Sequence, residues 1–156
     1  MTRSGSGQPP RGYAVRVTDA AASTAGPSVR FARHTNAFTE VVAFYREGIG
    51  LPVLGAFDDH DGYAGVIFGL PGSDHQLELT TTLAGGAERP APSRDDLLAL
   101  YYDTRAAVDD VAGRLALVAE RAWPANPYWQ TRVESVSFLD PDGWRVVLVY
   151  PRATSV

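Results

Sequence analysis

The sequence predicts an α+β fold in which a βαβββ unit occurs twice. Short runs of apolar residues, many of them alternating with polar ones, lie between clusters of Gly, Pro, Asp and Ser, as in strands joined by turns. Two longer segments place apolar residues at helical spacing, and each follows the first strand of its unit. A stretch rich in Gly and Pro, over 85–93, separates the two copies.

The first unit opens with a strand, continues with a helix and closes with three strands. Thr35 or Asn36 can cap the helix, because a side-chain oxygen there accepts a hydrogen bond from a backbone N–H of the first turn. Gly48 is expected to end it. The apolar residues at helical spacing are Phe38, Val41, Val42 and Tyr45. The predicted strands cover 29–33, 52–57, 63–70 and 75–81, with turns at 58–62 and 71–74.

The second unit repeats this order. A strand over 97–102 precedes a helix over 104–120. The apolar face of that helix carries Val108, Val111, Leu115 and Val118. Two closing strands are predicted over 133–139 and 145–150, and a weaker one lies around Trp123. Individual residues of the two copies also correspond, and the equivalent pairs are Phe68 with Phe138, Glu78 with Val147, Ala32 with Ala99, and His34 with Tyr101.

The chain therefore divides into an arm and one domain. Residues 1–28 are polar and rich in small side chains, which predicts a flexible N-terminal arm. Alternation of Tyr13, Val15 and Val17 within the arm allows one short additional strand. The predicted domain covers 29–151, with unit one over 29–82, a linker over 83–95 and unit two over 96–151.

Composition excludes several classes of protein. The chain has no cysteine, which excludes disulfide scaffolds and thiolate chemistry. All 14 basic residues are arginine, and 18 acidic residues outnumber them, which argues against a protein that binds nucleic acid. No apolar run approaches the roughly 20 residues that span a bilayer, and the start lacks the apolar core of a secretory signal. We therefore expect a cytoplasmic protein with neither a nucleic-acid nor a membrane partner.

Several short motifs resemble the vicinal-oxygen-chelate superfamily, which includes glyoxalase I, extradiol dioxygenases, fosfomycin-resistance enzymes and bleomycin-binding proteins. They are Phe44-Tyr45, Gly48-Ile-Gly-Leu51, Gln76-Leu-Glu-Leu79 and Asp140-Pro-Asp-Gly-Trp144. The stretches 60–63 and 126–129 also look like a bacterial subgroup of that superfamily. The resemblance covers about 29–151 and implies paired units that form a curved mixed sheet around a cleft, with the helices outside. It also implies a homodimer, because members of this fold commonly pair.

The same resemblance locates the metal-binding positions of the superfamily in this chain. Metal-dependent members take their ligands from the first and last strand of each unit, and these positions fall on Arg30, Glu78, Leu97 and Val147. A guanidinium cannot ligate a cation, and leucine and valine have no donor atoms. One carboxylate does not hold a catalytic divalent ion. We therefore expect no metal ion and no other cofactor.

Polar residues near these positions form the candidate site. Side chains alternate along a strand, so every second residue shares a face. These residues are Arg30, Ala32 and His34 on the first strand, and Gln76, Glu78 and Thr80 on the fourth. His34, a cavity residue or a structural histidine, is then the histidine expected to see the same cavity as Glu78. Glu78 is either a general acid or base, or a carboxylate that Arg30 neutralises across the cavity mouth, and the resemblance favours that ion pair.

Aromatic residues supply further candidates. Tyr101, which is equivalent to His34 in the repeat, is expected to face the same cavity. Tyr128 and Trp129 lie in a predicted loop, where they form a wall that stacks on an aromatic ligand or pack against the sheet or a partner subunit. Trp144 lies in the closing turn and is interpreted as part of the fold.

These features favour a protein that binds a small aromatic or amphipathic molecule in a metal-free cleft, as the bleomycin-binding branch does. The candidate ligand-binding residues are Arg30, His34, Glu78, Tyr101, Tyr128 and Trp129, with Glu78 also the candidate catalytic residue. The alternative is an enzyme of the lyase, isomerase or dioxygenase type. It would use Glu78, His34 or Tyr101 for proton transfer, or keep an atypical metal site. Loss of most ligand positions favours binding, whereas the polar residues left there favour catalysis.

Overall fold

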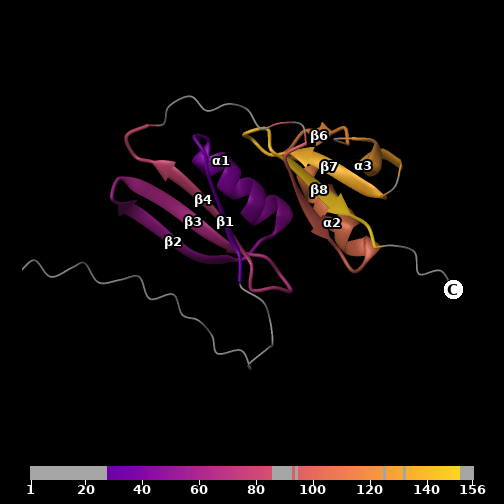
Figure 1. Ribbon diagram of the computed structural model, residues 1–156, viewed down its shortest axis with the longest axis horizontal. Helices are drawn as coiled ribbons and strands as arrows, with labels where there is room; N and C mark the ends of the chain where they lie inside the picture. Colours follow the sequence, from indigo (N-terminus) through magenta and orange to yellow (C-terminus); the bar gives the residue numbers. More distant parts are fainter. Residues whose placement is uncertain (1–27, 86–92, 94, 125, 132, 152–156) are drawn as a thin grey trace, which may run out of the picture.

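The computed structural model describes residues 28–85, 93, 95–124, 126–131 and 133–151. The elements of the first half are β1 (Arg30–His34), α1 (Phe38–Ala43), a π-helical segment η1 (Phe44–Ile49), β2 (Val53–His60), β3 (Tyr63–Gly69) and β4 (Gln76–Thr82) (Figure 1). Those of the second half are β5 (Leu97–Tyr101), α2 (Arg105–Leu115), β6 (Arg121–Ala122), α3 (Pro127–Thr131), β7 (Ser135–Leu139) and β8 (Arg145–Val149). The arm with Tyr13, Val15 and Val17, and most of the linker, lie outside the described residues.

The strands form two four-stranded mixed sheets with the same topology. The first sheet has the order β1-β4-β3-β2, and the second sheet has the order β5-β8-β7-β6. In each sheet the first strand runs parallel to the last and the other pairs are antiparallel. Ala32 lies opposite Glu78, as Ala99 lies opposite Val147. The predicted α+β class, the repeated unit and the equivalence of Glu78 with Val147 are therefore confirmed.

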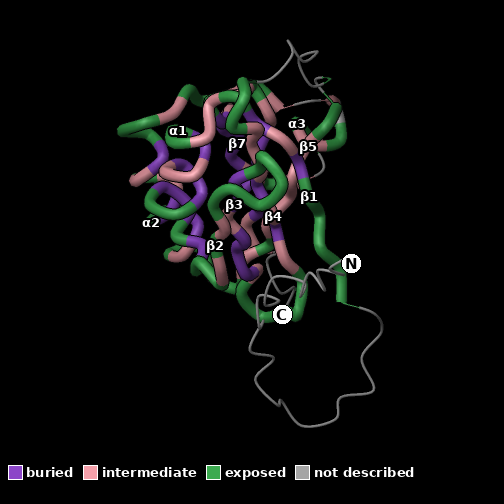
Figure 2. Tube along the Cα trace, turned by 90° about the vertical axis from the view of Figure 1, so that its left-hand side faces the viewer, coloured by how far each residue is buried: buried purple, intermediate pink, exposed green. Residues whose placement is uncertain are grey.

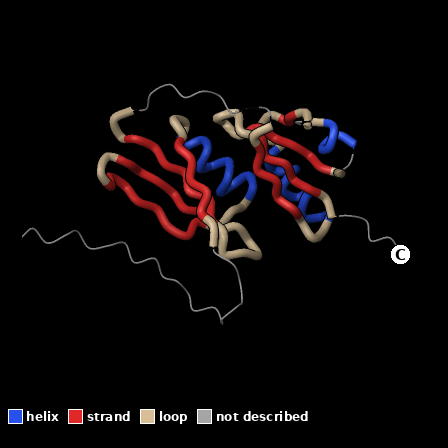
Figure 3. Tube along the Cα trace, viewed as in Figure 1, coloured by secondary structure: helices blue, strands red, loops and turns tan. Residues whose placement is uncertain are grey.

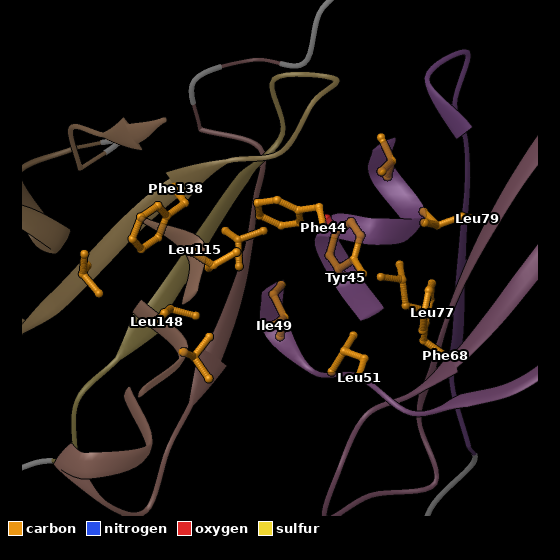
Figure 4. Close-up of a cluster of buried hydrophobic side chains, with 14 of the residues drawn as sticks. Phe44, Tyr45, Ile49, Leu51, Phe68, Leu77, Leu79, Leu115, Phe138 and Leu148 are labelled. Carbon is orange, nitrogen blue, oxygen red and sulfur yellow. The ribbon is translucent and has the colours of Figure 1, made fainter. Parts of the chain in front are cut away.

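The helices lie between the two sheets and share one core. Figure 4 shows Phe44 and Ile49 between the side chains of the first sheet and those of the second unit, and Figure 3 shows α1 between the two groups of strands. The Arg114 guanidinium of α2 also donates to the carbonyl oxygens of Gly48, at 3.0 Å, and Ile49, at 3.2 Å. The arrangement therefore differs from the expected single curved sheet with outer helices. The apolar faces of both helices are buried by packing together.

The end of the first helix differs from the prediction by two residues. The π-helical segment carries the chain past Gly48 to Gly50, which has a left-handed φ of 89° and closes the helix. Gly48 has another role, because a Cβ added there would lie 2.6 Å from Leu115 Cδ2. Close approach of η1 and α2 requires this glycine. At the start, Thr35 Oγ1 accepts a hydrogen bond from the Ala37 N–H at 3.0 Å.

Three other elements differ from the predictions. β2 continues to His60, so the hairpin turn is only Asp61-Gly62, with φ of 52° and 82°. α2 ends at Leu115 rather than near residue 120. Residues 127–131 form the short helix α3 rather than a loop. Among the described residues, no helix is both long and apolar enough to span a membrane.

Candidate functional site

The face of each sheet that points away from the helices is here called its open face. In β4, Leu77 and Leu79 belong to the core, so Gln76, Glu78 and Thr80 point to the open face of the first sheet. The parallel register places Arg30, Ala32 and His34 directly beside these three residues, on the same face. Arg30, His34 and Glu78 therefore share a face, as predicted. In Figure 2, β1 is exposed at its start and buried near its end.

Arg30 is held by two side chains of β4. Its Nη1 donates to Glu78 Oε2 at 3.2 Å, and its Nε donates to Gln76 Oε1 at 2.7 Å. The predicted contact between the two charged ends is thus present. The Arg30 side chain is 41% exposed and that of Glu78 15%. Water screens such a pair, so its contribution to stability is about 1 kcal/mol or less.

His34 lies at the end of β1 on the same face and is half-buried. Its Nε2 lies 3.2 Å from Asn36 Oδ1, so the ring has a local hydrogen-bond partner. The contact with Asn36 fits the interpretation of His34 as a structural histidine. The position on the open face fits the other interpretation, a polar residue beside the site.

An apolar floor adjoins the ion pair. Gly65, Ile67 and Gly69 of β3 point to the open face, since the intervening residues of this strand point to the core. A Cβ at Gly65 would lie 2.3 Å from Phe57 Cζ, so the edge of the Phe57 ring occupies the space over this glycine. Leu54 covers Gly69 in the same way, with its methyl carbons 3.3 Å from a Cβ there. Ile67 is the cross-strand neighbour of Glu78, so the floor begins where the ion pair ends.

Sequence reasoning missed this floor. The available signal was the pair of glycines four residues apart, on the same face of a strand, which marks the close approach of another group. Which group approaches depends on the partner strand, and the irregular register of β2 against β3 is not readable from the sequence.

The open face of the second sheet also points away from the helices, but it is mostly apolar and several of its residues are buried. Val147, Val149 and Ser137 point away from the helices, yet they are only 0%, 3% and 2% exposed. Leu97 and Ala99 of β5 lie on the same face. Another part of the chain must therefore lie over these residues.

We infer that the stretch between β6 and β7 contributes to this cover, and its described residues, 123–124, 126–131 and 133–134, are here called the covering segment. β6 lies at one edge of the second sheet and β5 at the other. Asn126, shortly after β6, has its side-chain nitrogen 3.4 Å from Asp95 Oδ1, just before β5. The chain then forms α3 and returns to Ser135 to begin β7 (Figure 1). The contact of Asn126 with Asp95 brings the segment from the β6 edge to the β5 edge of the second sheet, and a path across the open face accounts for the burial of Val147.

The predicted aromatic site residues belong to this second unit. Tyr128 and Trp129 lie in α3 of the covering segment, with ring centroids 5.3 Å apart and planes at 87°. The Tyr128 N–H donates to Asn126 Oδ1 at 3.1 Å, which stabilises the start of α3. Tyr101, at the end of β5, is 71% exposed. Because the helices separate the sheets, Tyr101 does not share a face with His34 in one chain, contrary to the prediction.

The superfamily's metal positions do not form a site here. Arg30 and Glu78 lie on the first open face, and Leu97 and Val147 lie on the second. No three His, Asp or Glu side chains are grouped to hold a metal ion anywhere in the part of the chain that the structure describes. The donor set, one guanidinium, one carboxylate and two alkyl groups, does not fit a divalent cation.

A buried ionic cluster joins the two units, and sequence reasoning missed its arginine. Arg33 Nη1 donates to Asp142 Oδ2 at 2.7 Å, and Nη2 donates to Asp140 Oδ2. Tyr45 donates its hydroxyl hydrogen to Asp140 at 3.1 Å, and the Trp144 ring lies 5.4 Å from the guanidinium. Burial raises the pKa of Asp140 above its ordinary value, while the charge of Arg33 opposes the rise. A charged residue at a core-facing position of β1 was the signal for this cluster.

Comparison with known proteins agrees with this fold. Residues 29–80 match the model of the YycE-like N-terminal domain, and residues 95–150 match that of the YycE-like C-terminal domain. YycE of Bacillus subtilis (strain 168), a protein without an assigned function, is 37% identical over 128 residues, which is 81% of this chain and 90% of YycE.

Solved structures extend the comparison. A crystal structure of a YycE protein from Bacillus subtilis has a TM-score of 0.72 at 36% identity, covering 82% of this chain and 92% of that one. That protein is of unknown function and is described as a candidate glyoxalase/fosfomycin-resistance protein. The trypanothione-dependent glyoxalase I of Leishmania major (TM-score 0.60, 18% identity, 81% and 87% covered) shares the fold alone. TnmS3, an antibiotic-binding protein from Streptomyces sp. CB03234, also shares the fold alone, with a TM-score of 0.57 at 22% identity, covering 83% of this chain and 99% of that one. The chain therefore belongs to the YycE-like family and shares the fold of glyoxalase I and of an antibiotic-binding protein.

Proposed function

We propose that this protein binds a small aromatic or amphipathic molecule on the open face of its first sheet, without a metal ion. The observation that carries the proposal is the apolar floor of Phe57, Ile67 and Leu54 beside the Arg30–Glu78 pair. A mostly apolar surface with a few placed polar groups is the usual composition of a small-molecule site. Leu54 is exposed and Phe57 is half-buried, whereas Ile67 is buried, so Leu54 and Phe57 are the parts of the floor that a ligand can reach.

The alternative, an enzyme that transfers a proton, has less support from the geometry. Glu78 Oε2 accepts a hydrogen bond from Arg30, so this oxygen is already engaged and is not directed at a ligand. Tyr101 lies on the other sheet of the same chain. The fold does not decide the question, because it is shared with both a glyoxalase and an antibiotic-binding protein.

A homodimer completes this site in our proposal. The two open faces of one chain lie on opposite sides of the shared core, so neither closes the other. β1 and β5 are edge strands of their sheets, and edges are commonly covered by a second chain. Pairing two copies through these edges brings Tyr101, Tyr128 and Trp129 of one chain toward Arg30 and Glu78 of the other.

Binding of a neutral naphthyl probe tests the proposed function. We expect 2-naphthamide to bind wild-type protein in calorimetric titrations, and Phe57→Ala to weaken binding about tenfold, since an aromatic anchor contributes about 1.4 kcal/mol or more. Leu117→Ala, which truncates an exposed side chain after α2, is the control and should leave affinity unchanged.

The two parts of the proposal have separate contradictory outcomes. Equal losses in Phe57→Ala and Leu117→Ala, or no binding by wild type, would contradict the site on the first sheet. Light scattering should give about twice the 16.8 kDa of one chain. A mass equal to one chain would contradict the dimer alone.

A further inference from the structure

We infer that the ligand of this site carries an oxyanion, such as a carboxylate, on an apolar body, and that Arg30 binds this group. The inference rests on the proposed function and names the chemical class of its ligand. It follows from the unused donors of Arg30, from the way this side chain is held, and from its distance to the apolar floor.

Some hydrogen-bond donors of Arg30 have no acceptor among the described residues. A guanidinium donates through Nε, Nη1 and Nη2. Within the described residues, Nε donates to Gln76 and one N–H of Nη1 donates to Glu78, while Nη2 makes no hydrogen bond. With 41% of the side chain exposed, these remaining N–H groups are accessible to a ligand. Two neighbouring N–H groups of a guanidinium match the two oxygens of a carboxylate.

The position of the guanidinium is fixed before any ligand arrives. Gln76 and Glu78 are alternate residues of β4, and both hold Arg30 from the neighbouring strand. An arginine already ordered in this way loses little side-chain entropy when it binds an anion.

The charge and the floor are spaced for one small molecule. Arg30 extends from β1 over β4, and the floor begins at Ile67 on the next strand, directly opposite Glu78. Cross-strand neighbours are about 5 Å apart, so one or two aromatic rings on the floor place their acidic substituent near Arg30. Phe57 forms the far side of this floor over Gly65.

The same contacts argue against a cationic ligand. Glu78 is the acidic partner, but it is 15% exposed and its Oε2 already accepts a hydrogen bond from Arg30. The carboxylate is therefore less accessible than the guanidinium. Glu78 also repels an incoming anion, so its neutralisation should strengthen the binding of anions.

Paired titrations with 2-naphthoate and the neutral 2-naphthamide test the inference. We expect wild-type protein to bind 2-naphthoate about tenfold more tightly than 2-naphthamide, which corresponds to about 1.4 kcal/mol. Arg30→Gln should weaken the binding of 2-naphthoate about tenfold and so abolish this preference, whereas Glu78→Gln should increase the preference. Arg105→Gln is the matched control, because Arg105 forms an exposed ion pair with Glu134 in the second unit.

The outcomes distinguish the inference from the function on which it rests. Equal affinities for 2-naphthoate and 2-naphthamide in wild type, or the same loss of preference in Arg30→Gln and Arg105→Gln, would overturn the oxyanion and leave the proposed function standing. Failure of wild type to bind either probe would overturn both.

Discussion

The two open faces of this protein have the same strand order and register but opposite surfaces. On the first sheet, the position of Glu78 carries a charge, paired with Arg30 and reached by solvent. On the second sheet, the equivalent position is Val147, which is fully buried. A repeated unit can therefore keep its backbone while one copy keeps a polar, accessible surface and the other becomes part of the interior.

The difference begins in the second strand of each unit. β2 (Val53–His60) is long and pairs with β3 along the whole edge of the first sheet. Its counterpart β6 (Arg121–Ala122) is only two residues long. In the first unit the residues of β2 form a long edge strand. In the second unit the described residues between the short β6 and β7 are not part of a strand, so they are available to cross the open face.

The largest expected effect on stability distinguishes the two arginines of β1, Arg33 on the core face and Arg30 on the open face. Arg33→Met should lower the free energy of unfolding by about 4 kcal/mol, because it leaves Asp140 buried without its cationic partner. Arg30→Met should cost about 1 kcal/mol or less, since Glu78 then keeps access to water. Urea denaturation of both variants at neutral pH measures the difference, and equal losses would contradict it.

The deficit of Arg33→Met should depend on pH. Burial already raises the pKa of Asp140 in the folded protein, and removal of Arg33 takes away the main opposing cause. A folded-state pKa above the unfolded value means that protonation favours the folded state. The deficit relative to wild type should therefore shrink as pH falls from 7 towards 4. A deficit that stays constant or grows on acidification would show that Asp140 is not the orphaned charge.

A smaller effect compares the equivalent positions of the two sheets directly. Val147→Gln should destabilise the fold by about 2 kcal/mol, because the covering segment leaves no water for the new amide. Glu78→Gln introduces the same side chain at the same register and should cost less than about 1 kcal/mol. Thermal or urea unfolding separates the two outcomes. If Val147→Gln were tolerated as well as Glu78→Gln, the covering segment would not seal the second sheet.

Much of the first sheet could be predicted from the sequence. Alternation along β1 and β4 places Arg30, His34 and Glu78 on one face, because the two-residue period of a strand is a local property. Their ion pair follows once the two strands are known to be neighbours. The position of Phe57 could not be predicted, since it depends on a register shift between β2 and β3.

The second unit was harder to predict because its special features are not periodic. Tyr128 and Trp129 follow a proline in a stretch with no helical or strand period, so the sequence alone left open whether they form a wall against a ligand or pack against the sheet or a partner subunit. The burial of Val147 beneath that stretch is a tertiary property. The packing of the helices between the sheets is tertiary too, and it depends on the contact of Gly48 with Leu115.

The central claim is that the first open face receives the ligand while the second is closed by its own chain. Methyl-detected NMR during a titration with 2-naphthamide tests this most directly. We predict shifts of the Leu54 and Ile67 methyl signals that saturate with one affinity, and unchanged signals for Val147 and Val149. Saturating shifts at Val147 and Val149, with Leu54 and Ile67 unmoved, would contradict the account.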